Sequence, residues 1–105
     1  MKEKRYRICL SVPIGQRNGT MLLRESGDKV DGWIEVMEHQ NPFSGSLCEN
    51  GWMNLSGSIR TLVSSIRYTA EGTVNGKRIL LNLATQSGDS YSVSGEEFAE
   101  NDEIL

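Results

Sequence analysis

The sequence is poor in the residues that build metal and cofactor sites. Its 105 residues include one histidine, two cysteines and two prolines. One histidine and two separated cysteines do not form a metal ligand set, and two cysteines are too few for a disulfide framework. The sequence therefore predicts no metal, no cofactor and reduced thiols, as in a cytoplasmic protein.

An excess of positive charge is also missing. The formal net charge is −3 and the isoelectric point is about 5.1. Nucleic acids and anionic membranes both select basic patches, so neither is expected as a partner. No apolar run is long enough to span a bilayer, and the short one at residues 8–14 is interrupted by Ser11 and Pro13. No small-residue cleavage site follows it, which argues against a signal peptide. We expect a soluble protein.

Helical periodicity is the third absence, since no segment of ten or more residues combines a helical apolar repeat with caps. Apolar and polar residues instead alternate, which places successive side chains on opposite faces of a β-strand. The clearest case is the segment 68–83, which is divided by Asn75-Gly76. Asn-Gly supplies the positive φ angles of a type I′ turn, so this segment predicts a β-hairpin.

Similar runs bounded by turn residues predict about eight short strands. We expect strands at residues 5–12, 19–25, 30–38, 46–48, 52–61 and 91–95, two more within 68–83, a loop at 13–18 and an irregular segment at 39–45 around Pro42. The short connections favour an up-and-down meander. Basic residues near the start of the first strand and acidic residues near the end of the last would lie side by side if the sheet closed.

These observations predict the fold class as all-β: an eight-stranded antiparallel up-and-down meander that closes into a small barrel. One domain is expected over residues 1–105, with an acidic tail from about residue 97.

A motif of apolar or small residue, any residue, glycine, any residue and apolar residue recurs at Gly32, Gly57 and Gly72, and in broken form at Gly95. Each glycine falls on the apolar face, although glycine weakens a strand interior. One interpretation is that the glycines leave room for a ligand. The other is that they let a small sheet coil tightly while a large side chain from a neighbouring strand fills the gap.

Catalytic chemistry has little support in the sequence. His39 lies beside Glu38 and nine residues before Cys48, which invites comparison with a cysteine–histidine nucleophile pair. No third residue that would orient the base, and no oxyanion donors, can be placed. We therefore predict no catalytic residues and a non-enzymatic protein.

Trp33 and Trp52 fall on the outward phase of their strands. Clustered outward aromatic residues suggest a partner surface, such as a homodimer interface. Two alternatives are a covering loop, in which Phe43 folds over the tryptophans, and a β-bulge that reverses the phase.

The x-Gly-x hairpins, the segment Asn41-Pro42-Phe43 and the run from Tyr68 to Val74 resemble a group of small bacterial proteins with calycin-like, lipocalin- or streptavidin-like β-barrels. This resemblance covers residues 6–95. Because segments of that group also occur attached to flavin- or nicotinamide-dependent oxidoreductases, it implies an accessory role to such an enzyme as an alternative function. The chain lacks the helix and the Gly-x-Trp motif of the lipocalins proper, so their ligands are not carried over.

Our leading hypothesis is a non-enzymatic barrel that binds a small apolar ligand at an open end or interacts with a partner protein. The candidate ligand-binding residues face inward on their strands: Leu10, Ile34, Leu55, Tyr68, Leu81 and Tyr91. The candidate lid is the segment 39–45, with His39, Asn41, Pro42 and Phe43.

Overall fold

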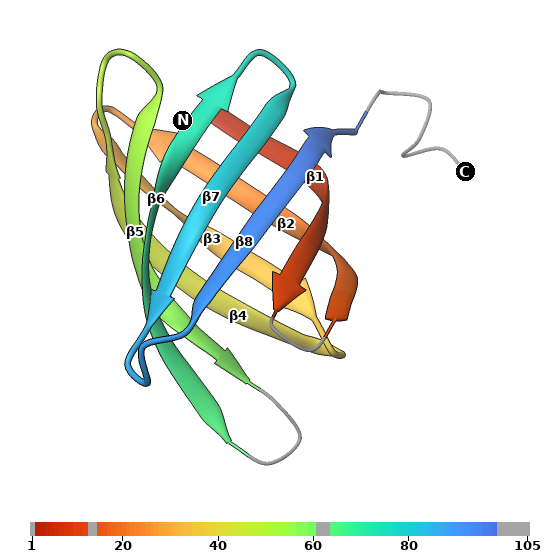
Figure 1. The fold of residues 1–105 in the computed structure, drawn as a ribbon. Coiled ribbons are helices and arrows are strands. Elements are labelled where there is room, and N and C mark those ends of the chain that lie inside the picture. Colours follow the sequence, from red (N-terminus) through yellow and green to blue (C-terminus); the bar gives the residue numbers. More distant parts are fainter. Residues whose placement is uncertain (1, 13–14, 61–63, 99–105) are drawn as a thin grey trace.

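The computed structural model describes residues 2–12, 15–60 and 64–98. Eight strands form one closed antiparallel barrel in which each strand pairs with the next and β8 pairs with β1 (Figure 1). This confirms the predicted meander. The strands are β1 (Lys2–Val12), β2 (Gly15–Ser26), β3 (Lys29–Val36), β4 (His39–Leu47), β5 (Trp52–Arg60), β6 (Ser65–Asn75), β7 (Arg78–Thr85) and β8 (Ser90–Glu97).

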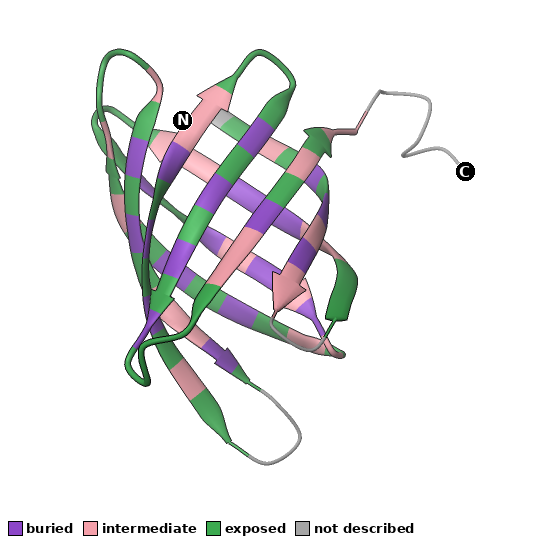
Figure 2. Ribbon diagram, viewed as in Figure 1, coloured by how far each residue is buried: buried purple, intermediate pink, exposed green. Residues whose placement is uncertain are grey.

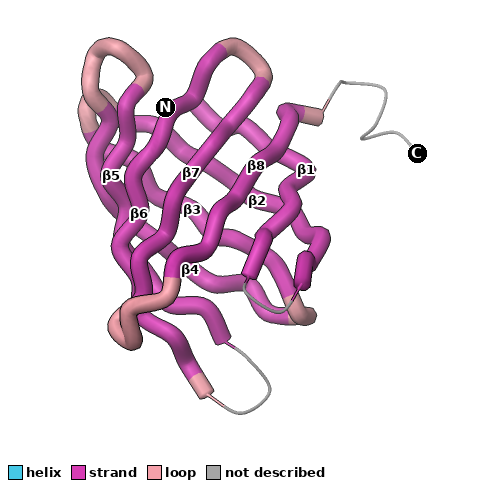
Figure 3. Tube along the Cα trace, in the orientation of Figure 1, coloured by secondary structure: helices cyan, strands magenta, loops and turns pink. Residues whose placement is uncertain are grey.

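Strands and their connections account for all the described residues, as Figure 3 shows. Those residues contain no helix with the length and apolar character that crossing a membrane requires. Buried and exposed positions alternate along the strands (Figure 2), and β7 alternates without a break, with Ile79, Leu81 and Leu83 buried. The period of two in the sequence is therefore the period of burial, because one face of each strand lines the barrel interior.

The two ends of the barrel carry different connections. The end at which β1 begins and β8 finishes, here called the terminal end, also holds the turns at 27–28, 48–51 and 76–77 (Figure 1, top). The opposite end, here called the distal end, holds the turns at 37–38 and 86–89. This assignment follows from the antiparallel order, since consecutive strands run in opposite directions.

Opposite charges meet where the barrel closes, as predicted. Arg7 on β1 is the register partner of Glu96 on β8. Glu96 also lies 3.5 Å from the guanidinium of Arg78 on β7, and the Arg7 guanidinium lies 5.4 Å from the ring centre of Phe98. Because the side chains of Arg78 and Glu96 are exposed, their ion pair contributes little to stability. β8 extends two residues beyond the predicted end at 95, and the rest of the predicted acidic tail, 99–105, lies outside the described residues.

Several predicted strand boundaries were wrong, among them the start of β2 and the end of β3. β2 begins at Gly15, within the predicted loop, because Gln16, Arg17 and Asn18 pair with β1 although their side chains are exposed. β3 ends at Val36 instead of residue 38. Met37 and Glu38 form the turn to β4, with φ of 52° and 67°. Such angles are strained for residues with a β-carbon. Because methionine and glutamate are not usual turn residues, the sequence did not indicate a turn at this position.

The predicted irregular segment at 39–45 is also wrong, since these residues belong to β4. His39 to Ser46 pair with β3 in continuous register. A lid made of His39, Asn41, Pro42 and Phe43 is therefore excluded, because a laddered strand in the barrel wall cannot open as a loop. Pro42 is tolerated because the pairing of β4 with β5 begins only at the next residue, Phe43.

The inward glycines are matched by large side chains on neighbouring strands. Phe43 is the register partner of both Gly32 and Gly57. A β-carbon added at Gly32 would lie 3.2 Å from the Phe43 ring, and one added at Gly57 would lie 3.0 Å from the Tyr68 hydroxyl. At these positions the second interpretation of the glycine motif is correct: neighbouring aromatic side chains occupy the space above the glycine.

Candidate functional site

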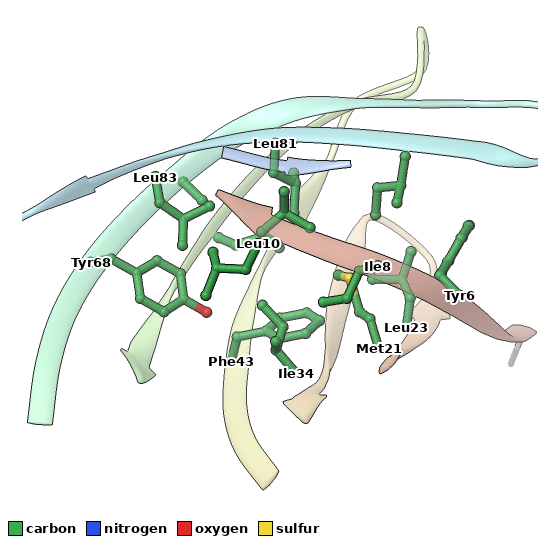
Figure 4. Packing of buried hydrophobic residues seen from close by; sticks show 14 of the residues in the cluster. Tyr6, Ile8, Leu10, Met21, Leu23, Ile34, Phe43, Tyr68, Leu81 and Leu83 are labelled. Atoms are coloured by element: carbon green, nitrogen blue, oxygen red, sulfur yellow. The ribbon is translucent and has the colours of Figure 1, made fainter. Parts of the chain in front are cut away.

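The six candidate ligand-binding residues contribute to one hydrophobic cluster inside the barrel (Figure 4). Five are buried with at most 4% of their surface exposed, and Tyr91 packs half-buried against the cluster. Leu10, Ile34, Tyr68 and Tyr91 lie in the distal half, whereas Leu55 and Leu81 lie nearer the middle of their strands. All six therefore belong to the one hydrophobic cluster that occupies the barrel interior.

Tyr68 carries an unsatisfied polar atom into this cluster. Its hydroxyl points into the barrel interior (Figure 4) and is buried without a hydrogen-bond partner. Thr85 is its register partner on β7, but the Thr85 hydroxyl donates to the carbonyl of Asp89 at 3.2 Å and accepts from the Asp89 N–H at 3.0 Å. Burial raises the pKa of Tyr68 to about 12, because the interior disfavours the phenolate. A buried hydroxyl without a partner costs about 1–3 kcal/mol.

Tyr6 presents a second such hydroxyl at the other half of the barrel. The side chain is fully buried and its hydroxyl has no partner. Burial, followed by repulsion from the carboxylates of Glu97 and Glu25, raises the pKa of Tyr6 to about 12. Tyr6 lies in the terminal half of β1, and its register partner Glu97 belongs to the same end of the barrel.

The raised pKa values of Tyr6 and Tyr68 predict that the folded protein loses stability in alkaline solution. The unfolded chain releases the phenolic proton near pH 10, whereas the folded protein keeps it to about pH 12. The contribution of each neutral tyrosine is therefore complete below pH 10 and falls as the pH rises from 10 to 12. We expect a slope of up to about 1.4 kcal/mol per pH unit for each group. Urea denaturation at several pH values should show a shallower slope for Tyr68→Phe, and an unchanged slope would contradict this.

A small hollow opens at the terminal end of the barrel, with a volume of about 240 Å³. Its apolar wall is formed by Leu23, Leu47 and Val74. Lys4 and Glu25 also line it. We call this hollow the terminal mouth. Sequence reasoning missed it, because its residues come from several strands and turns that only the closed barrel brings together.

Asn41 is a buried polar residue that was predicted as part of a lid and instead joins three strands. Its side-chain N–H groups donate to the carbonyls of Ile34 and His39, both at 3.0 Å. Its side-chain oxygen accepts from the backbone N–H of Arg60 at 2.8 Å. Because the backbone pairing of β4 with β5 does not extend to Asn41, this side chain holds the barrel wall together at the distal end.

Among the described residues, the two members of the suggested cysteine–histidine pair are not brought together. His39 begins β4 and Cys48 follows its last residue, so the length of the strand, roughly 30 Å, separates them. Both cysteines are free thiols. Within the ranges that the structure covers, no three His, Cys, Asp or Glu side chains are arranged to hold a metal ion.

The tryptophans lie on the outer surface, in the predicted phase. Trp33 is half-buried beside its register partner Leu22, and Trp52 is 38% exposed. Phe43 faces inward and the alternation of β3 is regular, so neither the covering loop nor the phase-reversing bulge occurs. Leu80 is 53% exposed on the outer face of β7. The homodimer interface stays a prediction.

No protein-family model and no curated protein matches the sequence. Several solved structures match the fold. A redesigned β-barrel has a TM-score of 0.72 and 10% identity, with 91% of this chain and 90% of that chain covered. The redesigned β-barrel mFAP1, bound to DFHBI, has a TM-score of 0.68 and 11% identity, with 89% and 92% covered. A de novo designed fluorescence-activating β-barrel has a TM-score of 0.64 and 9% identity, with 90% and 92% covered. At these identities the likeness shows the small eight-stranded barrel fold alone.

Proposed function

We propose that this protein is a non-enzymatic β-barrel that binds a small, largely apolar molecule at the distal end. The observation that carries the proposal is the Tyr68 hydroxyl, a buried hydrogen-bonding group without a partner inside an apolar cluster. A bound molecule with one hydrogen-bonding group would satisfy this hydroxyl and would place its apolar part against Leu10 and Tyr91. The ligand would enter past Tyr91, which is the partly exposed member of the six candidate residues.

Two further observations bear on the proposal. The matched barrels mFAP1 and mFAP0, which share the fold, are each described as bound to DFHBI. In the present structure the interior is filled by side chains, so binding would require rotamer changes at residues such as Leu10. Neither the fold nor the matched structures favours an oxidoreductase partner, and we do not propose one. We also propose that this protein is related to the calycin-like barrels, a relationship that the shared fold does not by itself establish.

Thermal denaturation with and without ligand tests the proposal, because a ligand that binds only the folded state must raise the midpoint. The probes are DFHBI, to which two of the matched barrels are bound, and 2-heptanone, which is largely apolar with one hydrogen-bond acceptor. We expect Tyr68→Phe to stabilise the free protein by about 1 kcal/mol, since it removes an unsatisfied buried group. The same variant should lose the ligand-induced rise.

Tyr6→Phe is the matched control, because it removes the other unsatisfied hydroxyl at the opposite end of the barrel. It should raise the stability of the free protein by a similar amount and keep the ligand-induced rise. The proposal is wrong if neither probe stabilises the wild-type protein, or if Tyr68→Phe responds to both as the wild type does.

A further inference from the structure

The terminal mouth has the composition of a second, chemically different binding site. Its wall of Leu23, Leu47 and Val74 can hold an apolar group. Its acidic lining residues are Glu25 and Glu49, and its basic one among the described residues is Lys4. The mouth is therefore apolar on one side and carries more carboxylates than cations.

The fully buried Tyr6 lies near this mouth on β1, although it is not one of the residues that line it. On β1 it is the next inward-facing residue after Lys4, and its register partner on β8 is the half-buried Glu97. On the other side of β1, Glu25 is half-buried on β2, near the start of β1. Two carboxylates on the strands that flank β1 thus lie at the same end as an unpartnered hydroxyl.

Within the described residues, the carboxylates of Glu25 and Glu97 form no ion pair. Ion pairs among the described residues include Arg24–Asp31 and Arg78–Glu96, both on the outer surface. Carboxylates that are half-buried beside an apolar wall favour a cation, because hydrogen bonds to charged groups are stronger than neutral ones, and more so out of water. A hydroxyl can accept a hydrogen bond from an ammonium group while it donates its own proton to a carboxylate.

We propose that the terminal mouth binds small primary amines that carry an apolar body. The ammonium group lies between Glu25 and Glu97 and donates to the Tyr6 hydroxyl, which in turn donates to one of the carboxylates. The apolar body lies against Leu23, Leu47 and Val74. This assignment goes beyond the proposed function, because it names a site at the other end of the barrel and a ligand class for it.

Titration of the ¹⁵N-labelled full-length protein with n-hexylamine, 1-hexanol and hexanoate at pH 7 tests the assignment by NMR. The three probes have the same alkyl chain and differ in charge. We expect shifts around Leu23 and Leu47, and a Kd for n-hexylamine at least tenfold below that of 1-hexanol. Hexanoate should bind more weakly than either.

Variants identify the groups responsible. Glu25→Gln should raise the Kd for n-hexylamine about tenfold, and Tyr6→Phe should also raise it. Glu71→Gln, which removes an exposed carboxylate from the outer face of β6, is the matched control and should leave the Kd unchanged. The dispersion of the spectra reports whether each variant is folded.

The outcomes separate this assignment from the proposed function. If n-hexylamine and 1-hexanol bind equally, or if Glu25→Gln binds n-hexylamine as the wild type does, the amine assignment is wrong. The proposed function still stands in that case if DFHBI or 2-heptanone stabilises the protein in a manner that depends on Tyr68. If none of the five probes binds, both are wrong. Binding of n-hexylamine that depends on Glu25, without any effect of DFHBI or 2-heptanone, supports the terminal mouth and overturns the distal site.

Discussion

Replacing Gly72 by alanine is expected to destabilise the protein by about 3 kcal/mol or more, a large part of the roughly 5–15 kcal/mol that stabilises a typical domain. Gly72 faces inward on β6, opposite Leu81. A β-carbon at this position would overlap the carbonyl oxygen of Leu80 and would lie 2.8 Å from both the Leu80 carbonyl carbon and the Leu81 Cα. All three atoms belong to the backbone of β7, so no side-chain rotation can relieve the overlap and the two strands must separate.

Urea denaturation followed by circular dichroism measures this loss. Gly27→Asn is the matched control, because Gly27 lies in the turn between β2 and β3 with φ of 64° and has nothing within 4 Å of an added β-carbon. Asparagine tolerates that conformation, so the control should cost under about 1 kcal/mol. If Gly72→Ala were as stable as Gly27→Asn, the close approach of β6 and β7 would be wrong.

Replacing Asn41 by leucine is the second change with a large expected effect. Leucine has the same number of side-chain heavy atoms and the same branching but cannot hydrogen-bond, so it leaves the Arg60 N–H and the carbonyls of Ile34 and His39 without the partner they have now. Each buried group left unsatisfied costs about 1–3 kcal/mol. Because some of them can turn to water at the distal end, we expect a total loss of about 3 kcal/mol.

Two measurements check this prediction. Urea denaturation gives the loss of stability, and hydrogen exchange of the Arg60 amide should accelerate more than that of amides in β7, because the break is local to β4 and β5. Asn82→Ala is the control, since Asn82 is exposed on the outer face of β7, and it should stay within about 0.5 kcal/mol of the wild type. Unchanged exchange at Arg60 in Asn41→Leu would show that the side chain does not hold the wall together.

The comparison of β4 with β7 shows which strands the sequence could predict. β7 follows an Asn-Gly turn and carries Ile79, Leu81 and Leu83 at alternate positions, so its position and inward face were both predicted correctly. β4 carries Asn41 and Pro42 near its centre, which are typical of a loop when taken in isolation. The strand forms because β3 offers it a continuous ladder and because the Asn41 side chain substitutes for the missing pairing with β5.

The candidate site also has a part that the sequence could predict and a part that it could not. Alternation alone placed Leu10, Ile34, Leu55, Tyr68 and Leu81 on the inward face, where the structure has them. The lid was wrong for the reason that β4 was missed. The terminal mouth was not foreseen, because Lys4, Glu25 and Val74 come from strands far apart in the sequence.

The sequence by itself determined that this chain forms eight antiparallel strands with a defined inner face, because the two-residue repeat and the turn residues act over short distances along the chain. The tertiary structure alone decided which large side chain lies over each glycine, which hydroxyls remain without a partner and where Asn41 replaces a backbone ladder. Those outcomes depend on the register between strands around a closed ring, and register is set by contacts between residues that the linear pattern does not connect.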